Sequence, residues 1–179
     1  MDISNAQFGF RESRSTDLCC NILKKVVHKF QMSGSYVFAC FVDLKKAFDT
    51  VNYWKLFEIL LARGIPRCYV RVLCSMYCSQ RLTVHWEQAV SDEFACGNGV
   101  RQGSSLSPFL FCIYIDGVLN DIMRTNVGCK IAGKVWNCLA YADDIVLFAP
   151  SWRGLQLLLD KLFDLLQPLD MVINCKKTV

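Results

Sequence analysis

Histidine and paired metal-binding thiols are what this sequence lacks most clearly. Only His28 and His85 are histidines among 179 residues, and none of the 11 cysteines forms a C-x-x-C pair. Neither histidine has ligand spacing to the thiols, so a zinc site is not expected. Most cysteines lie in apolar stretches such as VFACFVD and FLFCIYI, which indicates reduced, buried thiols. We therefore expect an intracellular protein, without a choice between nucleus and cytoplasm.

Long hydrophobic runs are also missing. The longest run, PFLFCIYI at 108–115, is well short of the roughly 20 residues that a membrane-spanning helix needs. The first residues, MDISNAQFGF, are too polar for a signal peptide. We expect no membrane association. The apolar fraction of 53% nevertheless supplies one domain with a sizeable core.

A strong excess of one charge is absent too. The net charge is +4, so composition alone does not indicate a nucleic-acid-binding protein. Lysines gather at Lys24, Lys25 and Lys29, a cluster that we interpret as the solvated face of a helix.

Hydrophobic periodicity and turn residues predict alternating helices and short strands. Helices are expected at 18–30 with a cap at Ser15 or Thr16, at 54–63, at 67–78, at 108–123 and at 155–166, and strands at 36–42, at 81–86 pairing with 92–96, and within 128–148 with turns at Ala132-Gly133 and Asp143-Asp144. This order predicts an α+β fold, with helices on one face of a mostly antiparallel sheet.

Two adjacent carboxylates, Asp143 and Asp144, interrupt the apolar stretch LAYADDIVLFA at 139–149. Asp43 ends another apolar strand, and if the strand ends lie side by side, the three carboxylates converge. Their mutual repulsion calls for hard divalent cations, and two such ions about 3.5–4 Å apart serve phosphoryl transfer. The pattern favours a metal-dependent nucleotidyl transferase or nuclease. An ordinary hairpin turn, which aspartate favours, is the alternative.

Five blocks of sequence together resemble the reverse transcriptase domain of non-LTR (LINE-type) retrotransposons, in that family's order. They are QFGFRESRST (7–16), FVDLKKAFDTV (41–51), GVRQGSSLSPFLF (99–111), YADDIVLF (141–148) and LLLDKLFDLL with INCKKT (157–178).

The resemblance implies a right-hand polymerase fold, in which the palm is an antiparallel sheet backed by helices. Residues 1–35 would be partial fingers, and residues 36–179 would be mainly palm with interleaved fingers elements. The same comparison implies a chain truncated at both ends, without a thumb and without the remaining fingers and endonuclease segments of a larger polyprotein. We therefore expect a fragment with weak or no activity alone.

The resemblance also implies a metal site and a chemistry. Asp43 and Asp143 would hold two Mg²⁺ ions, with Mn²⁺ able to substitute, supported by Asp144 and by the backbone carbonyl of Leu44. One ion would lower the pKa of the primer 3′-hydroxyl, and the other would neutralise the triphosphate and the departing pyrophosphate. The activity implied is RNA-directed DNA polymerase, with an RNA template, a DNA primer and dNTPs as partners.

Further residues receive roles by the same resemblance. Phe48 would exclude a 2′-hydroxyl, although a plain core phenylalanine fits its position nearly as well. Gln102 and Gly103 would contact the nascent base pair, where the glycine allows close approach. The remaining candidates are Tyr141 near the primer end, Arg11 and Arg14 on template phosphates, and Lys177 as a proton donor to pyrophosphate or simply a solvated lysine.

Two other interpretations stay open beside the enzyme. The chain can be a catalytically silent remnant that acts as a nucleic-acid-binding or structural module. A viral RNA-dependent RNA polymerase fits less well, because such relatives usually carry glycine before the paired aspartates and a small or acidic residue in place of Phe48.

Overall fold

A three-stranded antiparallel sheet forms the centre of the molecule in the computed structural model, which describes residues 3–179. Its strand order is β1 (Phe38–Val42), β9 (Asp144–Ala149) and β8 (Cys138–Tyr141), so that β9 pairs with both neighbours. Strands β1 and β9 are therefore adjacent in space although about 100 residues separate them in sequence.

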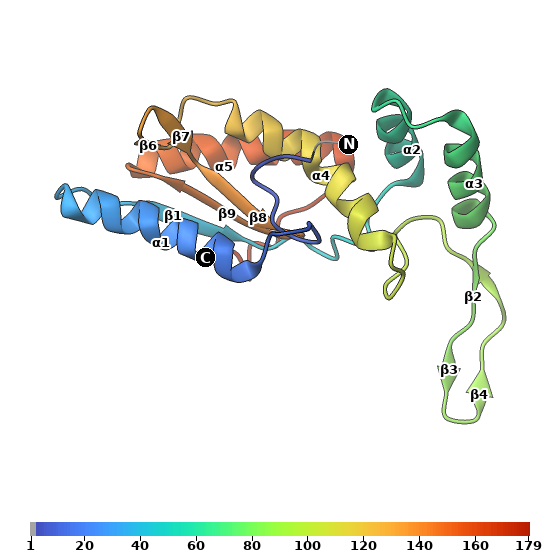
Figure 1. The fold of residues 1–179 in the computed structure, drawn as a ribbon. Helices are drawn as coiled ribbons and strands as arrows, with labels where there is room; N and C mark the ends of the chain where they lie inside the picture. The colour runs from blue at the N-terminus through green and yellow to red at the C-terminus, as the bar shows by residue number, and fades with distance from the viewer. Residues whose placement is uncertain (1–2) are drawn as a thin grey trace.

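The middle strand β9 is buried on both faces. Ile145, Leu147 and Ala149 pack in the main core, which also holds helices α4 (Ser107–Met123) and α5 (Trp152–Leu166). Val146 and Phe148 pack on the opposite face in a smaller cluster with α1 (Thr16–Met32). Figure 1 shows α4 and α5 on one side of the sheet and α1 on the other.

This arrangement corrects the expectation that helices cover one face alone. The physical reason is the composition of β9, which is apolar at every position from Ile145 to Ala149. A strand without polar alternation must be covered on both sides to remove its side chains from water.

Side-chain caps mark the starts of two helices, of which only the one before α1 was predicted; α5 begins at Trp152, before the expected start at residue 155. Ser15 accepts a hydrogen bond from Leu18 N at 3.1 Å and caps α1, and Ser151 caps α5 in the same way through Gly154 N. Helix α4 carries Pro108 in its first turn and is buried on nearly every side, as its uniform apolar sequence predicts. A short 3-10 turn, Gln167–Leu169, follows α5.

Helices α2 (Tyr53–Ala62) and α3 (Arg67–Cys78) lie at one end of the molecule (Figure 1). Their bounds match the predicted helices to within one residue. A buried ion pair joins Arg63, at the end of α2, to Asp116 on α4, and Asn120 donates a further hydrogen bond to the same carboxylate at 2.9 Å.

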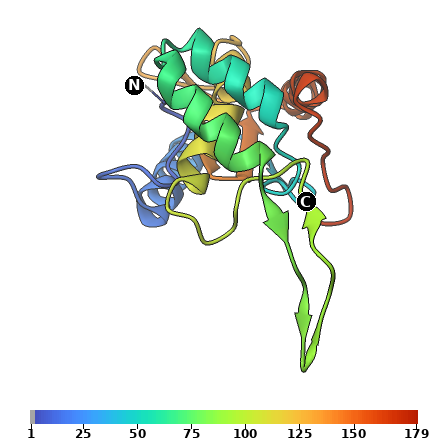
Figure 2. The ribbon, with the colours of Figure 1, turned by 90° about the vertical axis from the view of Figure 1, so that its right-hand side faces the viewer.

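A long β-hairpin arm projects from the body between α3 and α4 (Figures 1 and 2). At its base β2 (Arg81–Leu82) pairs with β5 (Phe94–Ala95), as predicted. Nearer the tip β3 (His85–Trp86) pairs with β4 (Ala89–Val90), a second ladder that the sequence did not indicate. Every residue of these four strands is exposed.

Two further short strands, β6 (Cys129–Ile131) and β7 (Lys134–Trp136), form a hairpin through the predicted turn at Ala132-Gly133. Both turn residues have positive φ, 49° and 77°, as a two-residue hairpin turn requires. Within residues 3–179, no helix combines the length and apolar character that crossing a membrane demands.

Candidate active site

A two-residue turn joins β8 to β9 and carries the first of the paired aspartates. Tyr141 pairs with Asp144, so the turn consists of Ala142 and Asp143. The expectation that Asp143 and Asp144 both form the turn is thus wrong by one residue, because Asp144 already belongs to the ladder of β9. Ala142 has φ 57°, in the left-handed region that residues with a Cβ rarely occupy.

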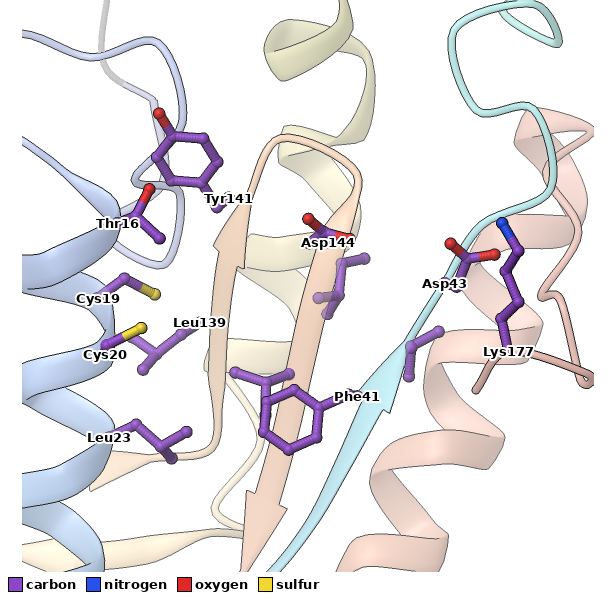
Figure 3. Close-up of a pocket in the computed structure, with 13 residues that line it drawn as sticks. Thr16, Cys19, Cys20, Leu23, Phe41, Asp43, Leu139, Tyr141, Asp144 and Lys177 are labelled. Atoms are coloured by element: carbon purple, nitrogen blue, oxygen red, sulfur yellow. The ribbon is translucent and has the colours of Figure 1, made fainter. Parts of the chain in front are cut away.

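The third aspartate reaches the same end of the sheet from β1. The last residue pair between β1 and β9 joins Val42 to Ile145. One residue further along, Asp43 leaves β1 at the point where Asp144 begins β9, and Figure 3 shows these two side chains on adjacent strands. The strand ends therefore lie side by side, which is the condition set for convergence of the three carboxylates.

The surroundings of Asp143 at this end of the sheet disfavour its ionised form. Burial raises the pKa of this carboxyl above its ordinary value, and the neighbouring charges of Asp144 and Asp43 raise it further. A bound cation would relieve both the desolvation and the repulsion. In the part of the chain that the structure describes, no three His, Cys, Asp or Glu side chains stand close enough together to hold a metal ion.

The C-terminal segment holds Asp43 in place. Asn174 Nδ2 donates to the Asp43 carboxylate at 2.8 Å, and Asn174 N donates to the Asp43 carbonyl at 2.8 Å. The Thr178 hydroxyl accepts from Asp43 N at 3.3 Å. The sequence did not predict these contacts, although both residues stand in the INCKKT block.

A cavity of about 690 Å³ gathers many of the predicted site residues. Asp43 and Asp143 line it at the end of the sheet where β1 stops and the β8–β9 turn lies, and Lys177 lines it from the C-terminal segment. The other lining residues are Leu44, Lys45, Lys46, Ala47, Phe48, Asp49, Thr50, Gln102, Val172 and Asn174. Four separate sequence blocks therefore meet around one space.

Phe48 and Gln102 take defined positions in this cavity. The Phe48 ring is half-buried and stacks on Phe111 of α4, with ring centroids 4.6 Å apart. Gln102 Nε2 donates to Asp49 Oδ1 at 3.1 Å. Gly103 follows with φ 81° and open space where a Cβ would stand, so the loop is free to approach a ligand closely.

A second groove of about 670 Å³ lies beside the same acids, between α1 and the sheet. Figure 3 shows α1 side chains, Cys19 among them, on one side of this groove and Asp43 with Lys177 on the other. Tyr141 and Asp144 also line it. Asp43 and Lys177 are thus shared between the groove and the cavity.

The two predicted template arginines are engaged with the chain itself. Arg11 donates to the carbonyls of Ser4 at 2.7 Å and Gln7 at 3.3 Å. Arg14 donates to Asn5 at 2.9 and 3.0 Å, and partial burial together with the charge of Arg11 lowers its pKa. Their role on template phosphates stays a prediction.

Comparison with known proteins identifies the family. The family model described as reverse transcriptase (RNA-dependent DNA polymerase) matches residues 1–179. The chain belongs to this family, as its motif blocks predict.

The curated relatives come from retrotransposable elements. The chain is 32% identical over 165 residues to the Retrovirus-related Pol polyprotein from type-2 retrotransposable element R2DM of Drosophila melanogaster. It is 27% identical over 142 residues to the corresponding polyprotein from the type-1 retrotransposable element R2 of Nasonia vitripennis. These matches cover 90% and 79% of this chain, but they span only 16% and 14% of the two relatives.

Solved structures show the same fold. The apo telomerase of Candida tropicalis, truncated from its C-terminal domain, superposes with a TM-score of 0.71 at 19% identity. The match covers 97% of this chain and 35% of that telomerase chain. The α+β palm architecture with part of the fingers is therefore confirmed.

Proposed function

We propose that this chain is the catalytic palm region of an RNA-directed DNA polymerase. It would join a dNTP to a primer 3′-hydroxyl by metal-dependent nucleotidyl transfer. Under this proposal residues 1–35 contribute to the fingers, and residues 36–179 form mainly the palm with interleaved fingers elements. RNA template, DNA primer and dNTPs are the proposed partners.

The observation that carries the proposal is the cavity of about 690 Å³. It joins two acids from different strands, Asp43 and Asp143, to Phe48, Gln102 and Lys177. A nucleotide needs this combination, because acids bind metal ions that hold its phosphates, a ring packs on its sugar and an amine meets its leaving group.

The donor set fits divalent magnesium. Carboxylate oxygens of Asp43 and Asp143 would hold the ions, supported by Asp144 and by the Leu44 carbonyl, and oxygen ligands are what Mg²⁺ and Mn²⁺ prefer. Burial, and after it the negative charges of Asp144 and Asp43, raises the pKa of Asp143, and a divalent cation would favour its ionised form. When bound, such ions activate the primer hydroxyl and neutralise the triphosphate.

The chain's own residues then position the substrates. Phe48, held by its stack on Phe111, presents a fixed ring to the sugar. Gln102 from the cavity wall and the adjacent Gly103 would approach the nascent base pair. Lys177 stands beside Asp43 and would protonate pyrophosphate (Figure 3). The groove lined by Tyr141 and Asp144 would receive the primer end.

Activity of these 179 residues alone is proposed to be weak. The cations that line the cavity are Lys45, Lys46 and Lys177, with no arginine among the lining residues of the described chain. Arginine binds phosphate with two parallel hydrogen bonds, whereas lysine acts as a point charge. We expect the triphosphate to be held loosely.

Template-primed incorporation of labelled dNTP with Mg²⁺ tests the proposal directly. The wild type should extend a DNA primer on an RNA template slowly, and Asp143→Ala should abolish this extension. Lys130→Ala, a substitution of an exposed lysine on β6, is the matched control and should extend as the wild type does.

Nucleic-acid binding separates the polymerase from the silent remnant. Binding of primer–template that is indifferent to Mg²⁺ and dNTP, with no extension that depends on Asp43 or Asp143, would favour a catalytically silent module. Robust, processive extension by the wild type would contradict the proposed weakness of the isolated chain.

A further inference from the structure

A fully buried glutamine lies directly behind the turn that carries Asp143. The Gln7 side chain has 0% exposed surface. Its Oε1 accepts from Ala142 N at 2.9 Å, and its Nε2 donates to Ala142 O at 3.2 Å. One side-chain amide thus satisfies both backbone polar groups of a residue 135 positions away.

Ala142 needs such support. Its backbone occupies the left-handed region at φ 57°, which costs free energy in a residue other than glycine. It is also only 5% exposed, so its N–H and C=O have little access to water. A buried backbone N–H or C=O without a hydrogen-bond partner lowers stability. The Gln7 side chain provides a partner for both groups of Ala142.

The surrounding backbone fixes Gln7 itself. Phe8 N donates to Ala140 O at 2.7 Å, and Ala140 N donates to Ala6 O at 2.8 Å, so residues 6–8 run alongside β8. Gly9 N donates to Gln7 Oε1 at 2.8 Å. A Cβ at Gly9 would overlap Ala142 N, so only glycine permits this close approach.

We propose that Gln7 is a positioning residue that fixes the Ala142-Asp143 peptide and thereby the direction of the Asp143 carboxylate. This inference rests on the proposed function of Asp143 as a metal ligand. Metal ligands need outer partners that restrict their orientation, and loss of such a partner typically lowers metal affinity about 10- to 100-fold. The buried amide supplies this restriction from a segment distant in sequence.

A matched control exists in the same molecule. Asn137 is also a buried amide, at 2% exposed surface, and it donates to the carbonyls of Ile122 and Val127 at 2.9 and 2.8 Å. Like Gln7 it hydrogen-bonds the backbone of a distant loop, but its side-chain amide donates to Ile122, Thr125 and Val127 and not to the Ala142-Asp143 turn. Loss of either amide should lower the Tm, whereas only loss of Gln7 should disturb Asp143.

Mn²⁺ binding to the full 179-residue chain, followed by electron paramagnetic resonance, separates the two roles. We expect Gln7→Met to bind Mn²⁺ about 10-fold more weakly than the wild type, and Asn137→Leu to bind it as the wild type does. Circular dichroism locates the thermal unfolding transition of each variant, and Mn²⁺ binding is measured at a temperature below that transition.

Two failures are distinguishable in this experiment. A wild type that binds Mn²⁺ no better than Asp143→Ala would overturn the proposed metal role of Asp143, and with it this inference. If the wild type binds Mn²⁺ more tightly than Asp143→Ala does, but Gln7→Met binds Mn²⁺ as tightly as the wild type, the role of Gln7 alone is overturned.

Amide hydrogen exchange in the wild type tests the contact without a variant. If Gln7 holds the turn in solution, Ala142 N–H should exchange as slowly as the core amides of β9, which open only in large unfolding events. Exchange of Ala142 at the rate of a frayed loop would overturn the proposal, even if Gln7→Met proved unable to fold.

Discussion

The carboxylate of Asp143 carries an electrostatic cost in the folded chain. Its raised pKa means that the folded state binds this proton more tightly than the unfolded state does. The deprotonated group therefore lowers stability at neutral pH. Below the ordinary aspartate pKa of about 3.9, both states are protonated and the cost disappears.

We predict that Asp143→Asn raises the Tm at pH 7 in the absence of divalent ions. The advantage should shrink as the pH falls through the carboxyl range, and it should also shrink when Mg²⁺ is added, because the ion stabilises the ionised wild type. Thermal unfolding between pH 3.5 and pH 8 measures this. Equal Tm values at pH 7 would contradict the prediction; Asp164→Asn, on the exposed side of α5, is the control.

The ring of Phe48 is predicted to select the sugar. Phe48→Val should raise ribonucleotide use relative to deoxynucleotide use by about 10-fold or more, since discrimination by one pocket group typically reaches 10- to 200-fold. Loss of the Phe111 stack should also cost about 1 kcal/mol of stability. Competition between rNTP and dNTP in primer extension measures selection, and Phe163→Val at an exposed position serves as the control.

At the scale of the elements, the Arg63–Asp116 pair ties α2 to α4. The Asp116 side chain is 2% exposed, so Arg63→Ala would leave a buried carboxylate without its cation. We predict a loss of about 3–5 kcal/mol in the free energy of unfolding. Urea denaturation should show less than about 1 kcal/mol for Arg124→Ala, which breaks an exposed pair with Asp121. Similar losses for the two variants would show that burial of Asp116 does not make the Arg63–Asp116 pair contribute more to stability than an exposed pair.

The hairpin arm contributes no residue to the hydrophobic core. None of the residues 81–95 belongs to either hydrophobic cluster. Replacing residues 83–93 by Asn-Gly would close the Leu82–Phe94 pair with a two-residue turn. We predict a Tm within about 2 °C of the wild type. A drop of more than about 5 °C would mean that the arm contributes to the stability of the body.

At the scale of the whole molecule, buried cysteines report global unfolding. Cys112, Cys129 and Cys138 lie in the core, and burial raises the pKa of their thiols to about 11, 11 and 12. They should stay neutral and unreactive at pH 8. The exposed cysteines are Cys20, Cys68, Cys78 and Cys175.

We predict that a thiol reagent labels the four exposed cysteines quickly and the three buried ones only as the chain unfolds. Mass spectrometry of peptides from a labelling time course, with and without urea, distinguishes the two groups. Fast labelling of Cys138 in the absence of urea would contradict the packing of β8.

Much of the fold follows from local sequence. Capping residues and apolar spacing predicted the helices to within a few residues, since both act over one or two turns. Ser15 and Pro108 are examples whose predicted positions the structure confirms. The second covered face of the sheet was not predicted, because whether α1 packs there depends on residues far from it in sequence.

By itself, the sequence determined the family, the element order and the three acids at strand ends, because motifs and periodicity are properties of neighbouring residues. Only the tertiary structure decided that Asp144 belongs to a strand while Asp143 occupies the turn, since register depends on pairing between strands. It also decided which amides hold the acids. Gln7 and Asn174 contact partners more than 100 residues away, and packing of the whole core brings them there.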